Sequence, residues 1–363
     1  MRKVMTVVGA RPQFIKASVL SRELAATKQV EEILVHTGQH FDQGMSGVFF
    51  DELDMKPPKI NLAVNGGTHG ENTGRMLEGL ERAMLQECPD VVVVYGDTDS
   101  TLAGTLAAAK LNIPVAHVEA GLRSGNRSMP EEVNRLVADR CADILYAPSE
   151  SARRNLLAEG MDDNSILVVG DIMYDCCIRV LSDMQRSGEQ NCSANGGGQY
   201  VLATIHRKGN VDNRLKLQAI LSKLGDVDGQ VVMPLHPRTK SKLREFGLSI
   251  PRNVACSEPL GYRDLMSTAR KARYVATDSG GLQKEAYFLG VPCITIREET
   301  EWTELLDAGV NVLVPAASKM RLDEAYRQII PSDKFPKFLY GHGDSGKLMV
   351  KDLMSRTLHK VSV

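Results

Sequence analysis

The sequence lacks any apolar stretch that approaches the roughly 20 residues a helix needs to span a bilayer. The apolar stretch near its start, residues 4–8, is also shorter than the roughly 7–15-residue core of a secretory signal peptide. Hydrophobic residues make up 43% of the chain, which is ordinary for a globular protein. We therefore expect no membrane partner and a cytoplasmic location.

The chain lacks an excess of charge of either sign, because 44 Lys and Arg residues stand against 45 Asp and Glu residues. Such a balance indicates neither a nucleic-acid partner nor a polybasic membrane anchor. An anionic ligand would therefore need a local binding site.

Two familiar motifs are missing as well. The seven cysteines are odd in number, and no two of them have the spacing of a zinc or redox pair, so we expect free thiols and no metal site. No Gly-x-Gly-x-x-Gly motif follows a predicted strand, which argues against a classical NAD site.

Short apolar runs alternate with helical patterns along the chain. Strands are predicted at residues 4–8, 33–36, 91–95, 115–119, 144–147, 200–204, 230–235, 274–277 and 292–296. Helices are predicted at residues 12–27, 68–88, 100–111, 131–142, 213–224, 281–289 and 346–359. This alternation predicts doubly wound parallel sheets. The Ser/Asn/Gly-rich stretch 185–199 indicates a surface loop near a domain boundary.

Polar residues that directly follow strands are candidate site residues, because ligands bind outside the carboxyl ends of parallel strands. Arg11 and Lys16 follow the first predicted strand, although a solvated helix start would account for them equally well. Asp97 follows the apolar strand 91–95. A helix cap by Asp99 or Ser100 leaves Asp97 unexplained, which favours a functional role for it.

Two further carboxylates follow in the first half. Glu119 ends the next predicted strand, where a carboxylate costs desolvation energy unless it is paired or used. Glu131 and Arg135 are spaced i,i+4 on one helix face, which ordinarily indicates a surface salt bridge worth roughly a few tenths of a kcal/mol. Because this helix directly follows the Glu119 loop, we include both residues as candidates.

The second half offers cations at strand ends. His206 and Arg207 end one predicted strand, and a His–Arg pair there suits a diphosphate. His236 ends another strand, although a buried core histidine would explain it equally well.

The segment Ser279, Gly280 and Gly281 joins a predicted strand to a predicted helix. Backbone N–H groups at such a helix start form an anion site. Glu285, about one turn further on, could accept both hydroxyls of a ribose. A simple cap by Ser279 explains the serine, but it does not explain the two glycines and the carboxylate.

One phosphate motif is rejected. Residues 341–347 fit the pattern G-x-x-x-x-G-K, but Leu348 follows where a Ser or Thr hydroxyl would bind magnesium.

Together these motifs resemble the non-hydrolysing UDP-N-acetylglucosamine 2-epimerases over nearly the whole chain. The resemblance rests on residues 9–12 with Lys16, 36–40, 96–98, 117–123, 130–135, 206–207, and 278–281 with Glu285. It implies a glycosyltransferase-B-like architecture, with two Rossmann-like domains facing across a cleft, usually in a homodimer. We assign residues 1–172 to an N-terminal domain, completed by a C-terminal helix at 346–363. We assign residues 173–345 to a C-terminal Rossmann-like domain that is expected to bind UDP.

The resemblance also implies the reaction. UDP leaves by anti elimination to give a 2-acetamidoglucal and then adds back with the opposite configuration at C2, without a cofactor. A general base must remove the C2 proton, and the leaving diphosphate needs cations and N–H donors. The expected acid/base residues are Asp97, Glu119 and Glu131, and which of them removes the C2 proton stays open. His206 is expected to assist catalysis. The expected substrate contacts are Arg11, Lys16, Arg135, Arg207, His236, Ser279, Gly280, Gly281 and Glu285.

The exact sugar and the competing functions stay open at this point. Trp302 stands where well-known bacterial members of the family carry an arginine. The tryptophan makes this chain more similar to the branch that acts on modified sugars such as UDP-2,3-diacetamido-glucuronate. The expected biological role is the supply of surface polysaccharide precursors. The alternatives are a hydrolysing UDP-N-acetylglucosamine 2-epimerase, a retaining glycosyltransferase of the same fold, and a non-catalytic nucleotide-sugar sensor.

Overall fold

The structure is a computed structural model that describes residues 1–39, 55–186 and 200–357. By its packing the chain divides into two compact units, Met1–Cys176 with Phe338–Val363, and Cys177–Lys337. The boundaries predicted from the sequence were 172/173 and 345/346. Most of the predicted surface loop, residues 187–199, lies outside the described residues. None of the described helices is both long and apolar enough to cross a bilayer.

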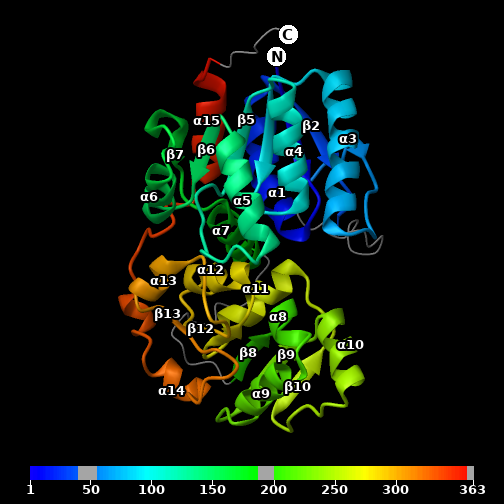
Figure 1. Ribbon diagram of the computed structural model, residues 1–363. Coiled ribbons are helices and arrows are strands. Elements are labelled where there is room, and N and C mark those ends of the chain that lie inside the picture. Colours follow the sequence, from blue (N-terminus) through cyan, green and yellow to red (C-terminus); the bar gives the residue numbers. More distant parts are fainter. Residues whose placement is uncertain (40–54, 187–199, 358–363) are drawn as a thin grey trace. The chain divides into compact units, whose positions relative to one another are not determined.

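The first unit contains one parallel sheet in the order β3-β2-β1-β4-β5-β6-β7 (Figure 1). Its strands are β1 (Arg2–Val8), β2 (Val30–His36), β3 (Ile60–Asn61), β4 (Val91–Tyr95), β5 (Val115–Val118), β6 (Ile144–Ala147) and β7 (Ile166–Val168). The order of strands reverses between β1 and β4, where Thr6 pairs with Val93. All five residues of β4 are fully buried, as expected for a central parallel strand covered on both faces.

Helices pack around this sheet. They are α1 (Arg11–Thr27), α3 (His69–Glu87), α4 (Asp99–Lys110), α5 (Pro130–Cys141), α6 (Glu150–Ala158), the 3-10 turn η1 (Asp163–Ser165), and α7 (Ile172–Arg186), which runs across the boundary between the units.

The last helix, α15 (Ser345–Ser355), returns to the first unit and packs on α1 (Figure 1, red). The Gly346 amide donates to the Asp175 carboxylate at 2.9 Å, and the Tyr146 hydroxyl of β6 donates to Asp352 at 2.9 Å. The sequence prediction of a helix over 346–363 was too long, because Arg356 adopts an extended backbone and ends the helix. Residues 358–363 lie outside the described part.

The second unit repeats the same architecture, with the sheet order β10-β9-β8-β11-β12-β13. Its strands are β8 (Tyr200–Thr204), β9 (Gln230–Pro234), β10 (Val254–Ser257), β11 (Val275–Thr277), β12 (Cys293–Thr295) and β13 (Asn311–Leu313). Its helices are α8 (Lys208–Val211), α9 (Arg214–Gly225), α10 (Pro237–Phe246), α11 (Tyr262–Arg270), α12 (Gly280–Phe288), α13 (Thr303–Asp307), α14 (Leu322–Tyr326) and η2 (Ser332–Lys334).

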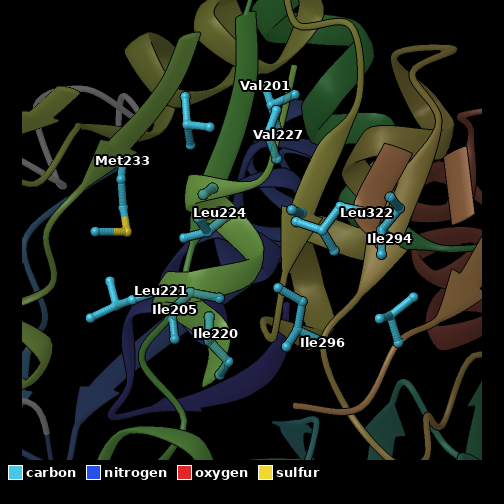
Figure 2. Close-up of a cluster of buried hydrophobic side chains, with 14 of the residues drawn as sticks. Val201, Ile205, Ile220, Leu221, Leu224, Val227, Met233, Ile294, Ile296 and Leu322 are labelled. Atoms are coloured by element: carbon cyan, nitrogen blue, oxygen red, sulfur yellow. The ribbon is translucent and has the colours of Figure 1, made fainter. Parts of the chain in front are cut away.

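The core of the second unit lies between its sheet and the helices α9 and α14 (Figure 2). Leu221 and Leu224 of α9 belong to one buried cluster with Leu322 of α14, which lies beside Ile294 of β12. Each fully buried side chain of this size stabilises the fold by roughly 1.5–3 kcal/mol. This packed layer fixes the strand ends from which the polar residues of the unit project.

Candidate active site

Each sheet has one point at which the strand order reverses, between β1 and β4 in the first unit and between β8 and β11 in the second. Loops that leave parallel strands at such a point diverge, which makes it the usual binding position of a doubly wound sheet. Arg11, Lys16 and Asp97 follow β1 and β4, whereas His206 and Ser279 follow β8 and β11. The predicted site residues therefore gather at both reversal points.

The turn after β1 is held tightly against β4. Gln13 accepts hydrogen bonds from the amides of Gly9 (2.8 Å) and Ala10 (3.0 Å), and donates to the Tyr95 carbonyl at 2.8 Å. A Cβ on Gly9 would clash with the hydroxyls of Thr37 and Ser100. Glycine is therefore required here for close approach. Arg11 is the first residue of α1 and is half-buried.

Lys16 and Glu119 form an ion pair between α1 and the end of β5. Both side chains are at most 10% exposed. A Cβ on Gly96 would lie 3.2 Å from the Lys16 Nζ and 3.2 Å from the Glu119 Oε2, so the pair packs directly on the turn that carries Asp97. Glu119 has a backbone φ of 73°, a left-handed conformation that is uncommon for a residue with a side chain.

Asp97 is held by Arg135. The guanidinium donates from Nε (3.0 Å) and Nη2 (2.7 Å) to the Asp97 Oδ2, while the Asp97 carboxylate stays 32% exposed. Asn134 adds a hydrogen bond to the Asp97 backbone carbonyl at 2.9 Å. Two predicted acid/base residues are thus each fixed by a buried cation, and both remain next to one turn.

Glu132, which was not predicted as a candidate, shares Arg135 with Asp97. Its carboxylate accepts from the amides of Ser124 (2.9 Å) and Gly125 (3.1 Å) and from the Arg135 Nη1 (2.7 Å). Burial alone would raise the pKa of Glu132, but these hydrogen bonds and the charge of Arg135 hold it below its usual range. Glu131, the predicted partner on this helix, lies half-buried in the first turn of α5.

The cap of α4 differs from both proposed caps. Thr98, and neither Asp99 nor Ser100, is the N-cap, and its hydroxyl accepts from the Thr101 amide at 3.3 Å. Asp99 is buried and instead pairs with the His69 Nδ1 at 2.8 Å.

In the second unit, Asp278 connects the ends of β8 and β11. This fully buried carboxylate accepts from the amides of His206 (2.9 Å) and Arg207 (3.0 Å) and from the Asn210 side chain (3.0 Å). Asp278 therefore sets the backbone positions of both predicted diphosphate contacts.

His206 and His236 lie side by side, with ring centroids 5.4 Å apart. His236 is exposed and caps α10 by accepting from the Arg238 amide at 3.2 Å, so the core-histidine interpretation was wrong. Burial lowers the pKa of His206, Asp278 acts in the opposite direction, and Arg207 lowers it further. The balance of these effects holds the pKa of His206 below its usual range.

The start of α12 has the features expected of an anion site. Ser279 is its N-cap, and a Cβ on Gly281 would meet no described atom within 4 Å. A Cβ on Gly280 would lie 2.5 Å from the Glu301 Oε1, so a side chain there would displace this carboxylate. Glu285 is buried on the same helix.

The adjoining Lys284 is fully buried, and its Nζ lies 3.8 Å from the centroid of the Trp302 ring. A desolvated cation–π contact of this kind is worth about 2 kcal/mol. Trp302 is only 3% exposed, so its indole is part of the packing beneath α12.

Among residues 1–39, 55–186 and 200–357, no group of three or more His, Cys, Asp or Glu side chains is arranged to hold a metal ion. The expectation that no cofactor is needed stays a prediction.

Comparison with known proteins identifies the family. The family described as UDP-N-acetylglucosamine 2-epimerase matches residues 22–354. The chain belongs to this family. A Pseudomonas aeruginosa protein named UDP-2,3-diacetamido-2,3-dideoxy-D-glucuronate 2-epimerase is 44% identical over 356 residues, which cover 97% of this chain and 99% of that protein. The UDP-N-acetylglucosamine 2-epimerase of Methanocaldococcus jannaschii is 40% identical over 362 residues, covering 97% of this chain and 98% of that protein.

Solved structures of the UDP-N-acetylglucosamine 2-epimerase family agree with the fold. The Methanocaldococcus jannaschii UDP-GlcNAc 2-epimerase in complex with UDP-GlcNAc and UDP has a TM-score of 0.90, at 40% identity, over 98% of this chain and 100% of that chain. The Neisseria meningitidis UDP-GlcNAc 2-epimerase bound to UDP-GlcNAc has a TM-score of 0.86, at 28% identity, over 98% of this chain and 100% of that chain. The predicted family, the predicted fold of two Rossmann-like domains in a glycosyltransferase-B-like class, and the predicted enzyme class of isomerase are confirmed.

Proposed function

We propose that this chain inverts C2 of a UDP-N-acetylamino sugar by anti elimination of UDP and its re-addition. The observation that carries the proposal is the pair of carboxylates, Asp97 and Glu119, set beside one turn at the reversal point of the first sheet, each held by a buried cation. The names of its relatives, which are UDP-amino-sugar 2-epimerases, support the same function.

The proposed elimination balances within the substrate. A carboxylate takes the C2 proton, the electron pair of the C2–H bond forms the C1=C2 double bond, and the C1–O bond breaks with its electrons leaving on UDP. In the return step a phosphate oxygen of UDP attacks C1 while a second carboxyl group delivers a proton to the opposite face of C2. Asp97, Glu119 and Glu131 are the candidates for these two roles.

Lys16 and Arg135 have a double role in this proposal. Without substrate they pair with Glu119 and Asp97, so an arriving diphosphate competes with these carboxylates for the two cations. A change of partner on binding would release a carboxylate to act as the base and would place positive charge near the leaving group. Arg11, at the start of α1, is assigned to the same anion.

The second unit is proposed to hold the nucleotide. The backbone amides of Ser279, Gly280 and Gly281 and the side chains of Arg207 and His236 contact the diphosphate, because they surround the start of α12 and the end of β8. Glu285 accepts the ribose hydroxyls, and His206 assists departure of the diphosphate.

The substrate is UDP-N-acetylglucosamine or a modified derivative. Relatives that are 44% and 40% identical are named for UDP-2,3-diacetamido-2,3-dideoxy-D-glucuronate and for UDP-N-acetylglucosamine respectively, so both sugars belong in the assay. A cytoplasmic location, a homodimer and a role in supplying surface polysaccharide precursors complete the proposal.

Proton exchange at C2 tests the proposed reaction. Incubation with UDP-N-acetylglucosamine, and separately with the 2,3-diacetamido uronate, in D2O is expected to give deuterium at C2 and an equilibrium mixture of two UDP-sugars by NMR. Free sugar and UDP as sole products would identify a hydrolysing enzyme instead. No exchange with any UDP-acetamido sugar would refute the epimerase proposal.

UDP binding is expected to take up a proton at His206. Burial lowers the pKa of His206 in the free protein, and the negative charge of a bound diphosphate raises it. Between the pKa of the free protein and the pKa of the complex, the affinity for UDP therefore increases as the pH falls. Calorimetry near pH 6, in buffers of different ionisation enthalpy, measures the uptake.

His206→Gln should remove the part of the proton uptake that occurs at His206. Comparison with the unmodified protein cancels the protons of UDP itself. His69→Gln, which changes an exposed histidine of the first unit, serves as the control and should keep the uptake unchanged. Equal uptake in the protein and in His206→Gln would show that His206 does not face the diphosphate.

A further inference from the structure

His117 lies in the middle of β5 with no exposed surface, and both of its ring nitrogens are hydrogen-bonded. Nε2 lies 2.7 Å from the Gly96 carbonyl, and Nδ1 lies 2.7 Å from the Asp139 Oδ1. A carbonyl only accepts hydrogen bonds, so Nε2 carries a proton.

The other side of the imidazole faces a carboxylate that already acts as an acceptor. The Asp139 Oδ2 accepts from the Gly121 amide at 3.0 Å and lies 2.7 Å from the Arg123 Nη1. Burial alone would raise the pKa of Asp139, but the charges of His117 and Arg123 hold it below its usual range. With acceptors at both nitrogens, the ring is protonated on both and carries a charge.

This buried pair holds the two turns that carry the proposed acid/base groups. One anchor is the carbonyl of Gly96, the residue before Asp97, and the other is the amide of Gly121, two residues after Glu119. All three residues, Gly96, Glu119 and Gly121, have positive φ, at 61°, 73° and 84°. For Glu119 such a backbone persists only where its surroundings enforce it.

We infer that His117, as a buried imidazolium paired with Asp139, is a positioning residue that sets the placement of Asp97 relative to Glu119. The inference rests on the proposed function, since it assumes that these carboxylates act on the substrate. His117 itself is no acid or base for the sugar, because it has no exposed surface and both its nitrogens are bonded within the protein. A buried ion pair contributes little to stability compared with apolar packing, so a gain in stability does not account for a charge at this strand position.

The kinetic test compares His117→Gln, Asp139→Asn and Glu159→Gln. A glutamine cannot donate to the Gly96 carbonyl and the Asp139 carboxylate from opposite sides, so the two turns lose their common anchor. We expect kcat to fall about 10²-fold, as for a shift of about 1 Å in a reacting group, with KM and the Kd of UDP unchanged within about threefold. Asp139→Asn should show the same pattern.

Glu159→Gln is the matched control, because it removes a charge only from the outer, exposed side of Arg123 and should leave kcat unchanged. Thermal unfolding of each variant is followed in parallel. A loss of kcat that follows only the folded fraction, or a loss confined to KM, would overturn the inference.

Nitrogen-15 NMR of labelled histidine tests the charge state independently of turnover. Two protonated ring nitrogens are expected for His117 near pH 7.5, and the amide resonances of Gly96 and Glu119 should shift in His117→Gln. A neutral tautomer, or unshifted amides, would overturn the inference. Absence of C2 exchange in the unmodified protein would refute the proposed function alone, and the NMR result would still decide the role of His117.

Discussion

Asp97→Asn is expected to reduce C2 proton exchange by about 10³-fold or more while the Kd of UDP stays within about threefold. An amide cannot take or deliver the C2 proton. Its oxygen still accepts from Arg135, which keeps Glu132 as a second partner, so the turn should hold its shape. Most of the proposed nucleotide contacts lie in the second unit, and the first-unit contacts Arg11, Lys16 and Arg135 are unchanged in this variant, which explains why UDP affinity should persist. NMR in D2O and calorimetry with UDP provide the two measurements.

Asp143→Asn is the control for this experiment. The Asp143 carboxylate accepts from the Val115 amide at 2.8 Å, at the start of β5 and just before β6. It is therefore an aspartate of the same sheet at the opposite, amino ends of the strands. Exchange should be unaffected in Asp143→Asn. Normal exchange in Asp97→Asn would remove Asp97 from the catalytic assignment and leave Glu119 and Glu131.

Strand ends were predictable because their signal is local. Asp97 follows five residues that are completely buried, and an apolar run that stops at a polar residue is visible in the sequence itself. The ion pairs of the site were not predictable in this way. Lys16 and Glu119 are separated by 103 positions, and only the parallel order of β1, β4 and β5 brings them together.

Helix register explains the confusion between Glu131 and Glu132. Both lie within one turn of Arg135, so spacing alone allows either to pair with it. The choice is made by tertiary structure, because the amides of Ser124 and Gly125 face Glu132. The sequence predicted this helix and Arg135 as part of the site, but it contains no information on where the loop with Ser124 and Gly125 folds back.

The short edge strand β10 was missed for a related reason. Only Val254 of its four residues is buried, so no apolar run marks it, and pairing with β9 creates the strand. Asp278 belongs to one of the sequence motifs but was not predicted as a site residue, although it organises the end of β8. Its importance follows from its donors, which are brought to it by the neighbouring strand β8.

Asp278→Ala is therefore expected to have a large effect on stability and binding together. The substitution leaves the amides of His206 and Arg207 and the Asn210 side chain without their shared acceptor, in a place where the carboxylate had no exposed surface. Each buried donor left without its acceptor costs about 1–3 kcal/mol. UDP affinity should fall at least about tenfold, because the two proposed diphosphate contacts lose their backbone anchor.

Asp212→Ala is the matched control for Asp278→Ala, since Asp212 pairs with Arg238 at the surface and should change unfolding free energy by less than about 1 kcal/mol. Chemical denaturation and calorimetry with UDP measure both variants. If Asp278→Ala lowered stability but kept UDP affinity, the ends of β8 and β11 would be joined for folding alone. The nucleotide would then have to be held by the start of α12 without His206 and Arg207. A loss of UDP affinity at unchanged stability would instead mean that water replaces the Asp278 carboxylate in the fold. The negative charge of Asp278 would then serve to orient His206 and Arg207 toward UDP.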